Sequence, residues 1–192
     1  MVQVHSKIFI ISAPSGAGKT TLVKAMMERF DCFAFSISAT TRGPRSYEQD
    51  GVHYHFLELE DFKQRRENGE FLEWEEVYPG KFYGTLRTEV DNILAQGKCP
   101  IFDVDVVGGV NIKQEYGSRA VSIFIQPPHA EVLLERLKSR ASEDSTAIHE
   151  RYSKAKKELA FASKFDHVIV NDVLEVAIDE MQTLIQSYLR TP

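Results

Sequence analysis

A glycine-rich segment near the start of the chain constrains the fold more than any other feature. It has the sequence Ala13-Pro14-Ser15-Gly16-Ala17-Gly18-Lys19-Thr20-Thr21 and follows the apolar run Ile8–Ile11, which predicts a short buried strand. After Lys19, apolar residues recur at helical spacing as far as Phe30. Except at Ala13, the segment matches the pattern G-x-x-x-x-G-K-[ST] of nucleotide phosphate loops, and it has the strand and helix that such a loop requires on either side. We call residues 13–21 the phosphate loop.

The residue types in this loop suit a polyphosphate ligand. Glycines at 16 and 18 allow successive backbone N–H groups to turn inward as an anion nest, and the following helix adds its own N–H groups and dipole. We expect Lys19 to bring a mobile positive charge to the β- and γ-phosphates and the Thr20 hydroxyl to ligate Mg²⁺. Ala13 replaces the first glycine, which is tolerable if this residue has negative φ. The loop predicts a nucleoside triphosphate donor and leaves the acceptor open.

Four further short apolar runs predict strands, and the long connections between them carry helical periodicity. Such alternation predicts a parallel sheet with helices on both faces, and hence an α/β, three-layer α/β/α fold of phosphate-loop type with a five-stranded parallel core sheet. Gly97 is expected to end a helix over Arg87–Gln96, and a further helix is expected to start near His129. The four runs are Ala34–Ser38, Pro100–Val104, Ala120–Ile125 and His167–Val170.

Two segments depart from this alternation. Ser38–Thr85 is polar and turn-rich, with a helix-like Glu60–Glu67 and a strand-like Phe71–Val77, and is predicted to form a small α+β insertion. Arg136–Lys157 is highly charged, with an expected helix break at Ser142–Ser145. We expect a core of residues 1–37, 86–129 and 163–192, an insertion of residues 38–85 and a helical segment of residues 130–162.

The composition narrows the function classes. The formal net charge of −5 argues against a nucleic-acid-binding protein, since such proteins usually carry a basic excess. No apolar stretch approaches the roughly 20 residues needed to cross a bilayer, and the first residues do not have the form of a secretion signal. Cys32 and Cys99 are too few for a disulfide framework. We expect a cytoplasmic protein, and nothing indicates its oligomeric state.

Seven segments together resemble the guanylate kinase family. Ser38-Ala39-Thr40-Thr41-Arg42-Gly43-Pro44-Arg45 is similar to the family signature S-x-T-T-R-x-P-R, and the similarity covers nearly the whole chain in the right order. It implies Mg²⁺-dependent transfer of the γ-phosphate of ATP to GMP, and to dGMP, with a GMP-binding insertion and a lid formed by residues 130–162. The other segments are Gly51–Phe56, Phe71–Trp74, Phe82–Thr85, Ile101–Asp105, Arg136–Glu158 and Val168–Asp172.

The chemistry of several residues agrees with a GMP acceptor. Arg42 and Arg45 lie three apart in a turn and could converge on one phosphate, for which guanidinium forks are well suited, although solvated surface charge is the alternative. Glu73 lies among apolar residues, and its carboxylate could accept from the adjacent N1–H and N2–H₂ donors of guanine, unless it faces outward from an amphipathic strand. By resemblance, Arg42, Arg45, Tyr54 and Tyr83 hold the GMP phosphate, and Ser38, Glu73, Thr85 and Asp105 hold the base.

Asp103 and Asp105 are two apart at the end of a predicted strand, so both side chains should leave the same face. By resemblance, Asp103 lies near Mg²⁺, Arg140 and Arg151 close over the transferring phosphoryl group together with Lys19 and Arg42, and Asn171 contacts adenine. The sequence offers no convincing general base. None is required, because the acceptor phosphate, with a second pKa of about 6, is already largely dianionic at neutral pH. The remaining basic residues of the lid are interpreted as surface charges: Arg136, Lys138, Lys154, Lys156 and Lys157.

Two other functions are compatible with parts of this pattern. One is a non-catalytic module of guanylate kinase type that binds phosphopeptides, which the presence of Lys19, Thr20 and Asp103 disfavours. The other is a related kinase with a different phosphorylated acceptor, which the combination of Glu73, Thr85 and Asp105 disfavours because it matches a guanine edge.

Overall fold

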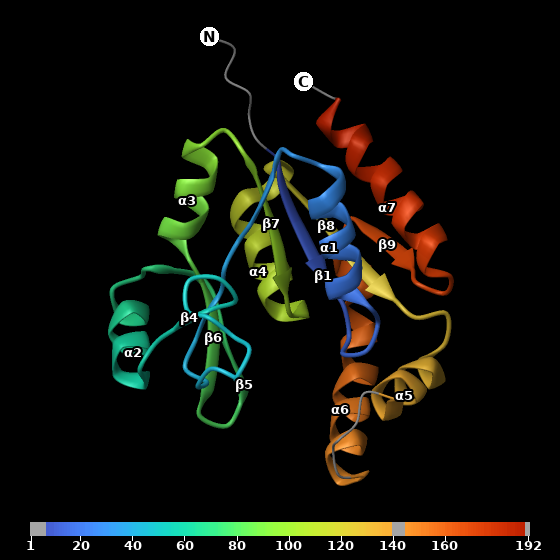
Figure 1. Ribbon diagram of the computed structural model, residues 1–192, viewed down its shortest axis with the longest axis horizontal. Coiled ribbons are helices and arrows are strands. Elements are labelled where there is room, and N and C mark those ends of the chain that lie inside the picture. The colour runs from blue at the N-terminus through green and yellow to red at the C-terminus, as the bar shows by residue number, and fades with distance from the viewer. Residues whose placement is uncertain (1–6, 140–144, 191–192) are drawn as a thin grey trace.

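The central element is a five-stranded parallel sheet with the strand order β2-β7-β1-β8-β9. The computed structural model describes residues 7–139 and 145–190 (Figure 1). Every pair of neighbouring strands in this sheet is parallel, as the alternating sequence pattern predicted. The strands are β1 (Ile8–Ser12), β2 (Phe33–Phe35), β7 (Cys99–Val104), β8 (Ala120–Gln126) and β9 (His167–Val170).

Helices cover both faces of this sheet. On one face, α1 (Lys19–Arg29) and α7 (Leu174–Leu189) pack against Phe9 and Ile11 of β1. On the other face, α3 (Arg87–Ala95) and α4 (Val106–Tyr116) pack against Ile8 and Ile10. Because β1 is buried on both sides, all five of its residues are buried, which explains its continuous apolar sequence.

The insertion forms a second sheet beside the core, in the order β4-β3-β6-β5. Its small hydrophobic cluster joins Phe62 of the helix to Phe71, Leu86 and Ala39 of the strands. The sequence predicted the helix and the long strand but missed β3 and β4, because strands of two residues are too short to show alternation. The elements are β3 (Ala39–Thr40), β4 (His55–Phe56), α2 (Leu59–Glu67), β5 (Phe71–Tyr78) and β6 (Lys81–Leu86).

The charged segment forms two helices, α5 (Ala130–Ser139) and α6 (Ser145–Glu158), which lie across from the insertion in Figure 1. The expected restart of the helix at Ser145 is confirmed, and the remainder of the expected break lies outside the described residues. Two short 3₁₀ turns complete the chain, η1 (Gly117–Arg119) before β8 and η2 (Leu159–Lys164) before β9. None of the helices in the described part of the chain is long and apolar enough to cross a membrane.

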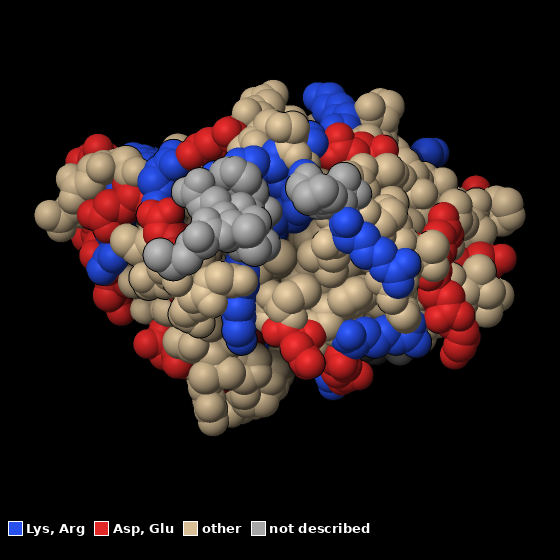
Figure 2. All heavy atoms as spheres, turned by 90° about the horizontal axis from the view of Figure 1, so that it is seen from above, with Lys and Arg blue, Asp and Glu red and all other residues tan. Residues whose placement is uncertain are grey.

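The two ends of the parallel sheet differ in their surroundings. Strands β1 and β7 point downward in Figure 1, so their carboxyl ends lie between the insertion and α6. The opposite end is seen from above in Figure 2, where Lys and Arg side chains lie among Asp and Glu. Because ligands bind at the carboxyl ends of the strands in open α/β sheets, the lower end is where a site is expected.

Candidate functional site

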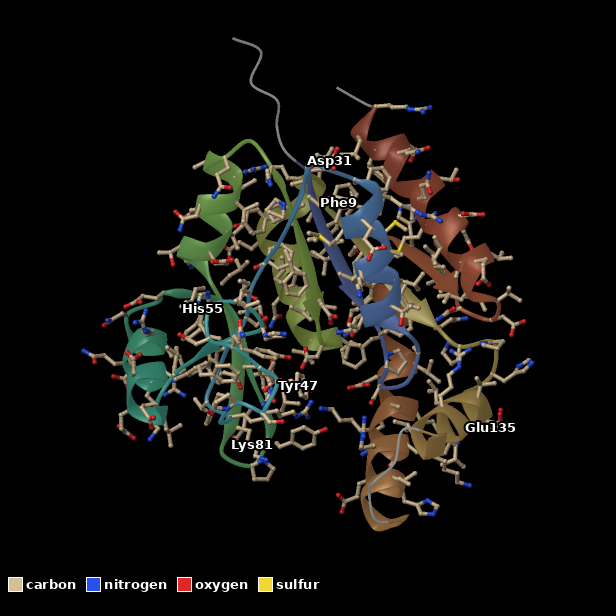
Figure 3. All side chains as sticks on the ribbon, viewed as in Figure 1. Phe9, Asp31, Tyr47, His55, Lys81 and Glu135 are labelled. Carbon is tan, nitrogen blue, oxygen red and sulfur yellow. The ribbon has the colours of Figure 1, made fainter. Side chains whose placement is uncertain are left out.

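A cavity of about 570 Å³ opens at the carboxyl ends of β1 and β7. It is bounded by the phosphate loop, the end of β7, the insertion and α6. In Figure 3, Tyr47 lies on the side of the insertion that faces α6, and Lys81 lies at the end of the β5–β6 hairpin. A smaller hollow of about 130 Å³ adjoins the cavity on the insertion side, and Ser38, Tyr54 and both Asp103 and Asp105 line the two together. The site therefore has two connected halves.

The phosphate loop owes its shape to two glycines with positive φ. Gly16 has a φ of 92° and Gly18 a φ of 95°. Residues other than glycine rarely adopt such positive values, because their Cβ would clash with the backbone. A Cβ on Gly18 would also lie 2.3 Å from Nδ2 of Asn171. That nitrogen donates a 2.7 Å hydrogen bond to the carbonyl oxygen of Ala17, and the Asn171 side chain is buried. Asn171 thus holds the phosphate loop in place through this buried hydrogen bond.

Ala13, which departs from the loop pattern, is accommodated without strain. Among residues 7–139 and 145–190, only glycines have positive φ, so Ala13 has an ordinary backbone conformation. Its side chain is buried in the core below the loop. Ala13 therefore has the backbone conformation under which alanine is tolerated at this position.

Lys19 and Thr20 at the start of α1 meet the end of β7. The Lys19 ammonium forms an ion pair with Asp103 and donates a 2.9 Å hydrogen bond to the carbonyl oxygen of Val104. The Thr20 hydroxyl donates to the other carboxylate oxygen of Asp103 at 3.2 Å. A lysine, a hydroxyl and a carboxylate that are far apart in sequence therefore converge at the mouth of the loop.

Helices α5 and α6 also reach the loop. Nη2 of Arg151 on α6 donates to the Ser15 hydroxyl at 3.0 Å, so one of the two arginines predicted to lie near the phosphates is beside the phosphate loop. A Cβ on Gly16 would be in ordinary contact with Leu133 and Leu137 of α5, so this helix packs directly against the loop. Arg140, the other arginine assigned to this role, lies outside the described residues.

A third, shallower hollow of about 290 Å³ lies on the far side of the loop. Gly16, Gly18, Thr21 and Asn171 line it, together with Arg136. The Arg136 guanidinium donates a 3.0 Å hydrogen bond to the backbone oxygen of Asn171. The interpretation of Arg136 as a surface charge is therefore wrong, because this side chain binds the strand end that supports the loop.

Glu73 is buried at the end of the smaller hollow. Its Oε1 accepts a 2.7 Å hydrogen bond from the buried hydroxyl of Thr85, its cross-strand neighbour. A Cβ on Gly108 would lie 2.6 Å from Oε2, so only glycine at this position leaves room for the carboxyl group. Burial raises the pKa of Glu73 to about 7, and the nearby Asp105 adds to the rise while Thr85 opposes it. The sequence alternative of an outward-facing Glu73 is wrong.

Asp103 and Asp105 both line the two hollows, as their spacing predicted. Asp105 follows the end of β7 and caps α4, since its Oδ1 accepts a 2.8 Å hydrogen bond from the Gly108 N–H. This cap holds the Asp105 carboxylate beside Glu73 in the smaller hollow.

Arg42, on the insertion side of the site, is held by several partners. Its guanidinium makes two hydrogen bonds, of 2.7 and 2.9 Å, to the Glu48 carboxylate and donates from Nε to the Tyr83 hydroxyl at 3.2 Å. It also lies over the Tyr54 ring, 5.3 Å from the centroid. The Arg42 hydrogen bonds lower the pKa of Glu48 to about 2, so this carboxylate stays ionised.

The second arginine of the signature points to a different partner. Nη1 of Arg45 donates to the Tyr47 hydroxyl at 3.1 Å, while the Arg45 backbone N–H donates to Glu48 at 2.7 Å. Arg45 is exposed. The structure thus brings Arg42, Tyr54 and Tyr83 together, with Arg45 on the adjoining turn.

Four charged residues that line the cavity or the smaller hollow were not among the residues predicted for the site. Glu48 carries no motif, and its only sequence signal is its place in the turn that follows Arg45. Lys154, which was interpreted as a surface charge, lines the cavity with its ammonium 5.2 Å from the centroid of the Tyr78 ring. Glu158 lies one helical turn further, and burial raises its pKa. Glu75 follows Glu73 on the same face of β5 and lines the smaller hollow.

Comparison with known proteins adds an independent finding. A family model described as guanylate kinase matches residues 5–188. A guanylate kinase of Bacteroides fragilis is 50% identical over 185 residues, which is 96% of this chain and 91% of that protein. A guanylate kinase of Chlorobium chlorochromatii is 45% identical over 188 residues, 98% of both chains. The crystal structure of guanylate kinase from Anaplasma phagocytophilum superposes with a TM-score of 0.75 at 27% identity, covering 97% of this chain and 87% of that one.

Proposed function

The chain belongs to the guanylate kinase family, and we propose that it transfers the γ-phosphate of ATP to GMP, and to dGMP, giving ADP and GDP. The observation that carries the proposal is the buried Glu73 carboxyl, hydrogen-bonded to Thr85 in a hollow that opens directly onto the phosphate loop. A carboxylate accepts from the N1–H and N2–H₂ donors of guanine, whereas it would face the N1 lone pair of adenine. The connected hollows would allow such a base to lie next to a triphosphate donor.

ATP is assigned to the phosphate loop. Residues 13–21 would enclose its phosphates, with backbone N–H groups and Lys19 supplying the positive potential. The shallow hollow beside Thr21 and Asn171 adjoins the loop and is assigned to adenine. In this proposal Asn171 has two tasks, because its side-chain nitrogen already holds the carbonyl oxygen of Ala17.

The oxygen atoms at the mouth of the loop fit a magnesium ion. The Thr20 hydroxyl and the Asp103 carboxylate lie 3.2 Å apart, and both are the hard oxygen ligands that Mg²⁺ prefers in combination with phosphate oxygens. We propose that Thr20 and Asp103 hold the ion, Asp103 through a water molecule. When bound, Mg²⁺ supplies positive charge to the β- and γ-phosphate oxygens.

GMP is assigned to the insertion side. Glu73, Thr85, Asp105 and Ser38 would bind the guanine ring in the smaller hollow. Its phosphate would be bound by Arg42, Tyr54 and Tyr83, which already contact one another, together with Arg45 from the adjoining turn. Since Arg42 donates to Glu48 in the structure, an arriving phosphate would have to share or replace this carboxylate as the acceptor.

The transfer itself requires positioning and positive charge rather than a base. The GMP phosphate is largely dianionic at neutral pH, so no proton has to be removed before it attacks the γ-phosphorus in line. Lys19, Arg42, Arg140 and Arg151 are the proposed cations around the transferring group, with Asp103 orienting Lys19.

The three-part division also belongs to the proposal. Residues 38–85 would close on GMP and residues 130–162 on ATP, relative to a core of residues 1–37, 86–129 and 163–192. Such closure would exclude water and suppress hydrolysis of ATP. We also propose that the enzyme acts in the cytoplasm, because Cys32 and Cys99 are both free thiols, which suits a reducing compartment.

Release of ADP in a coupled assay with GMP, dGMP, AMP, CMP and UMP as acceptors tests the proposal. We expect rapid turnover with GMP and dGMP only, and magnesium removal by EDTA should abolish it. Comparable rates with AMP and GMP would overturn the guanine assignment. Absence of turnover with every acceptor, together with binding of a phosphopeptide, would identify a binding module instead.

A further inference from the structure

Glu75 occupies a defined position between the two ends of the acceptor hollow. It lies two residues after Glu73 on β5, so the two side chains leave the same face of the strand. On the neighbouring strand β6, Glu73 is paired with Thr85 and Glu75 with Tyr83. Glu75 is half-buried and lines the hollow with Glu73 and Tyr83.

The two flanking pairs have different proposed tasks. Glu73 and Thr85 are joined by the 2.7 Å hydrogen bond and form the base end of the hollow. Tyr83 accepts a hydrogen bond from Arg42 at 3.2 Å and belongs to the phosphate end. In a nucleoside monophosphate, the sugar connects the base to the phosphate. A ligand that spans these two ends therefore brings its sugar past Glu75.

The charges around Glu75 decide which part of the ligand it can attract. Burial raises the pKa of Glu75, the negative charge of Asp105 adds to this rise, and the positive charge of Lys154 on α6 opposes it. Glu75 lies on the same face of β5 as the buried Glu73 and lines the smaller hollow, so its carboxyl group faces the hollow and not the outer surface of the insertion. A carboxylate repels the ligand phosphate, and the base edge is already matched by Glu73. The sugar hydroxyl groups are the remaining donors.

We propose that Glu75 is a specificity residue that accepts a hydrogen bond from a ribose hydroxyl of the acceptor, and so favours GMP over the analogue that lacks this hydroxyl. The inference rests on the proposed function, since it takes GMP as the acceptor and orients it by Glu73 and Arg42. It adds a sugar contact to the base and phosphate contacts already assigned, from a residue that carries no motif. If the 2′-hydroxyl is the donor, dGMP is still turned over, at lower efficiency than GMP.

The test compares kcat/KM for GMP, 2′-deoxy-GMP and 3′-deoxy-GMP in the wild-type enzyme and in Glu75→Ala and Glu75→Gln. For a hydrogen bond to a charged acceptor we expect the wild type to prefer GMP by about tenfold or more over one of the two analogues, and that analogue identifies the hydroxyl. Glu75→Ala should lower the value for GMP by about tenfold and leave that analogue unchanged, so that the preference falls to about one. Glu75→Gln, which keeps an acceptor oxygen but loses its charge, should retain part of the preference.

Glu76→Gln is the matched control, because Glu76 is the neighbouring carboxylate on the opposite, exposed face of β5. It should leave all three values at wild-type level. Titration calorimetry of the same ligands provides the preference without turnover, should a variant be inactive. An unchanged preference in Glu75→Ala overturns the inference, and so does an equal rise for all three acceptors, which would mean that Glu75 only repels the phosphate. If the wild type turns over none of the three, the proposed function fails; if it turns them over without a Glu75-dependent preference, only this inference fails.

Discussion

The two halves of the site are built on different physical principles. On the donor side, the phosphate loop is shaped by backbone conformation and by contacts with the core, such as the positive φ of Gly18 and the hydrogen bond from Asn171 to Ala17. On the acceptor side, the main groups are side chains that hold one another: Glu73 bonds Thr85, and Arg42 pairs with Glu48. The donor loop is thus held by core contacts that a ligand need not break, whereas on the proposed acceptor side Arg42 would have to share or exchange Glu48 when a phosphate arrives.

The difference explains where charge is costly. Glu48 is kept ionised by Arg42, while burial brings the pKa of Glu73 to about 7, so that near neutral pH this carboxyl is partly protonated before a ligand binds. Guanine donors would replace part of the hydration that Glu73 has lost. A buried carboxylate that lacks a full set of hydrogen-bond donors in the empty site makes the site selective, because a base without those donors leaves the carboxylate unpaired.

The largest expected effect tests the donor side. Lys19→Ala should lower kcat by about a thousandfold or more, because the cation nearest the transferring phosphate is removed while Asp103 remains. The fold should survive, since Lys19 is not part of the hydrophobic core. Steady-state ADP release and circular dichroism measure the two quantities. Lys24→Ala, an exposed lysine on the same helix, is the control and should change neither. A Lys19 variant with wild-type kcat would contradict the donor assignment.

The next effect belongs to the acceptor side alone. Glu73→Ala should lower kcat/KM for GMP by about a hundredfold or more, since the base loses its charged acceptor, while the affinity for ATP changes little. Acceptor kinetics at saturating ATP and titration with a non-hydrolysable ATP analogue separate these effects. Glu67→Ala, an exposed glutamate on α2, serves as the control. Equal losses for both nucleotides would show that the two halves are not independent.

The pH dependence follows from the raised pKa of Glu73. Guanine requires the ionised carboxylate, so kcat/KM for GMP should rise about tenfold per pH unit below about 7 and level off above it. GMP itself also titrates near pH 6. Comparison with Glu73→Gln separates the two, because the variant should retain only the ligand's own titration. Identical profiles would exclude Glu73 as the titrating group.

The same ionisation has an opposite effect on stability. The folded-state pKa of Glu73 lies above the ordinary value of 4.5, so the free energy of unfolding of the wild type should fall as pH rises from about 4.5 to about 7 and stay constant above that. A pKa shift of this size corresponds to a fall of at most roughly 3 kcal/mol in the free energy of unfolding. Urea denaturation at pH 5 and pH 8 should show this fall in the wild type and its absence in Glu73→Gln. A parallel fall in both would contradict the assignment.

The smallest expected effect concerns the support of the loop. Asn171→Ala removes the donor to Ala17 and leaves that buried carbonyl oxygen without this bond, which should cost about 1–2 kcal/mol of unfolding free energy. The KM for ATP should rise several-fold while the KM for GMP is unchanged. Asn111→Ala, at an exposed position on α4, is the matched control. A larger change in the KM for GMP than in the KM for ATP would contradict the assignment of Asn171 to the donor side.

Local patterns were sufficient for some parts of the structure and not for others. The parallel sheet and the phosphate loop could be predicted because apolar periodicity and glycine placement act over a few residues. β3 and β4 could not, since two-residue strands exist only through pairing with partners far along the chain, as Ala39 with Gly84 and His55. Glu48 and Lys154 were missed for a related reason: a charged residue in a polar segment has the same sequence appearance whether it faces solvent or a ligand cavity.

By itself, the sequence determined the family, the five-stranded core and the chemical types available at the site, because these depend on short motifs and on periodic burial. Only the tertiary structure decided that Thr85 and Gly108 enclose the Glu73 carboxyl, that Arg42 is paired with Glu48, and that Glu75 lines the smaller hollow opposite Tyr83. Each of these arrangements joins residues from different elements. The pKa of a carboxyl group and the partner of a guanidinium depend on that three-dimensional environment, which strand pairing and helix packing create.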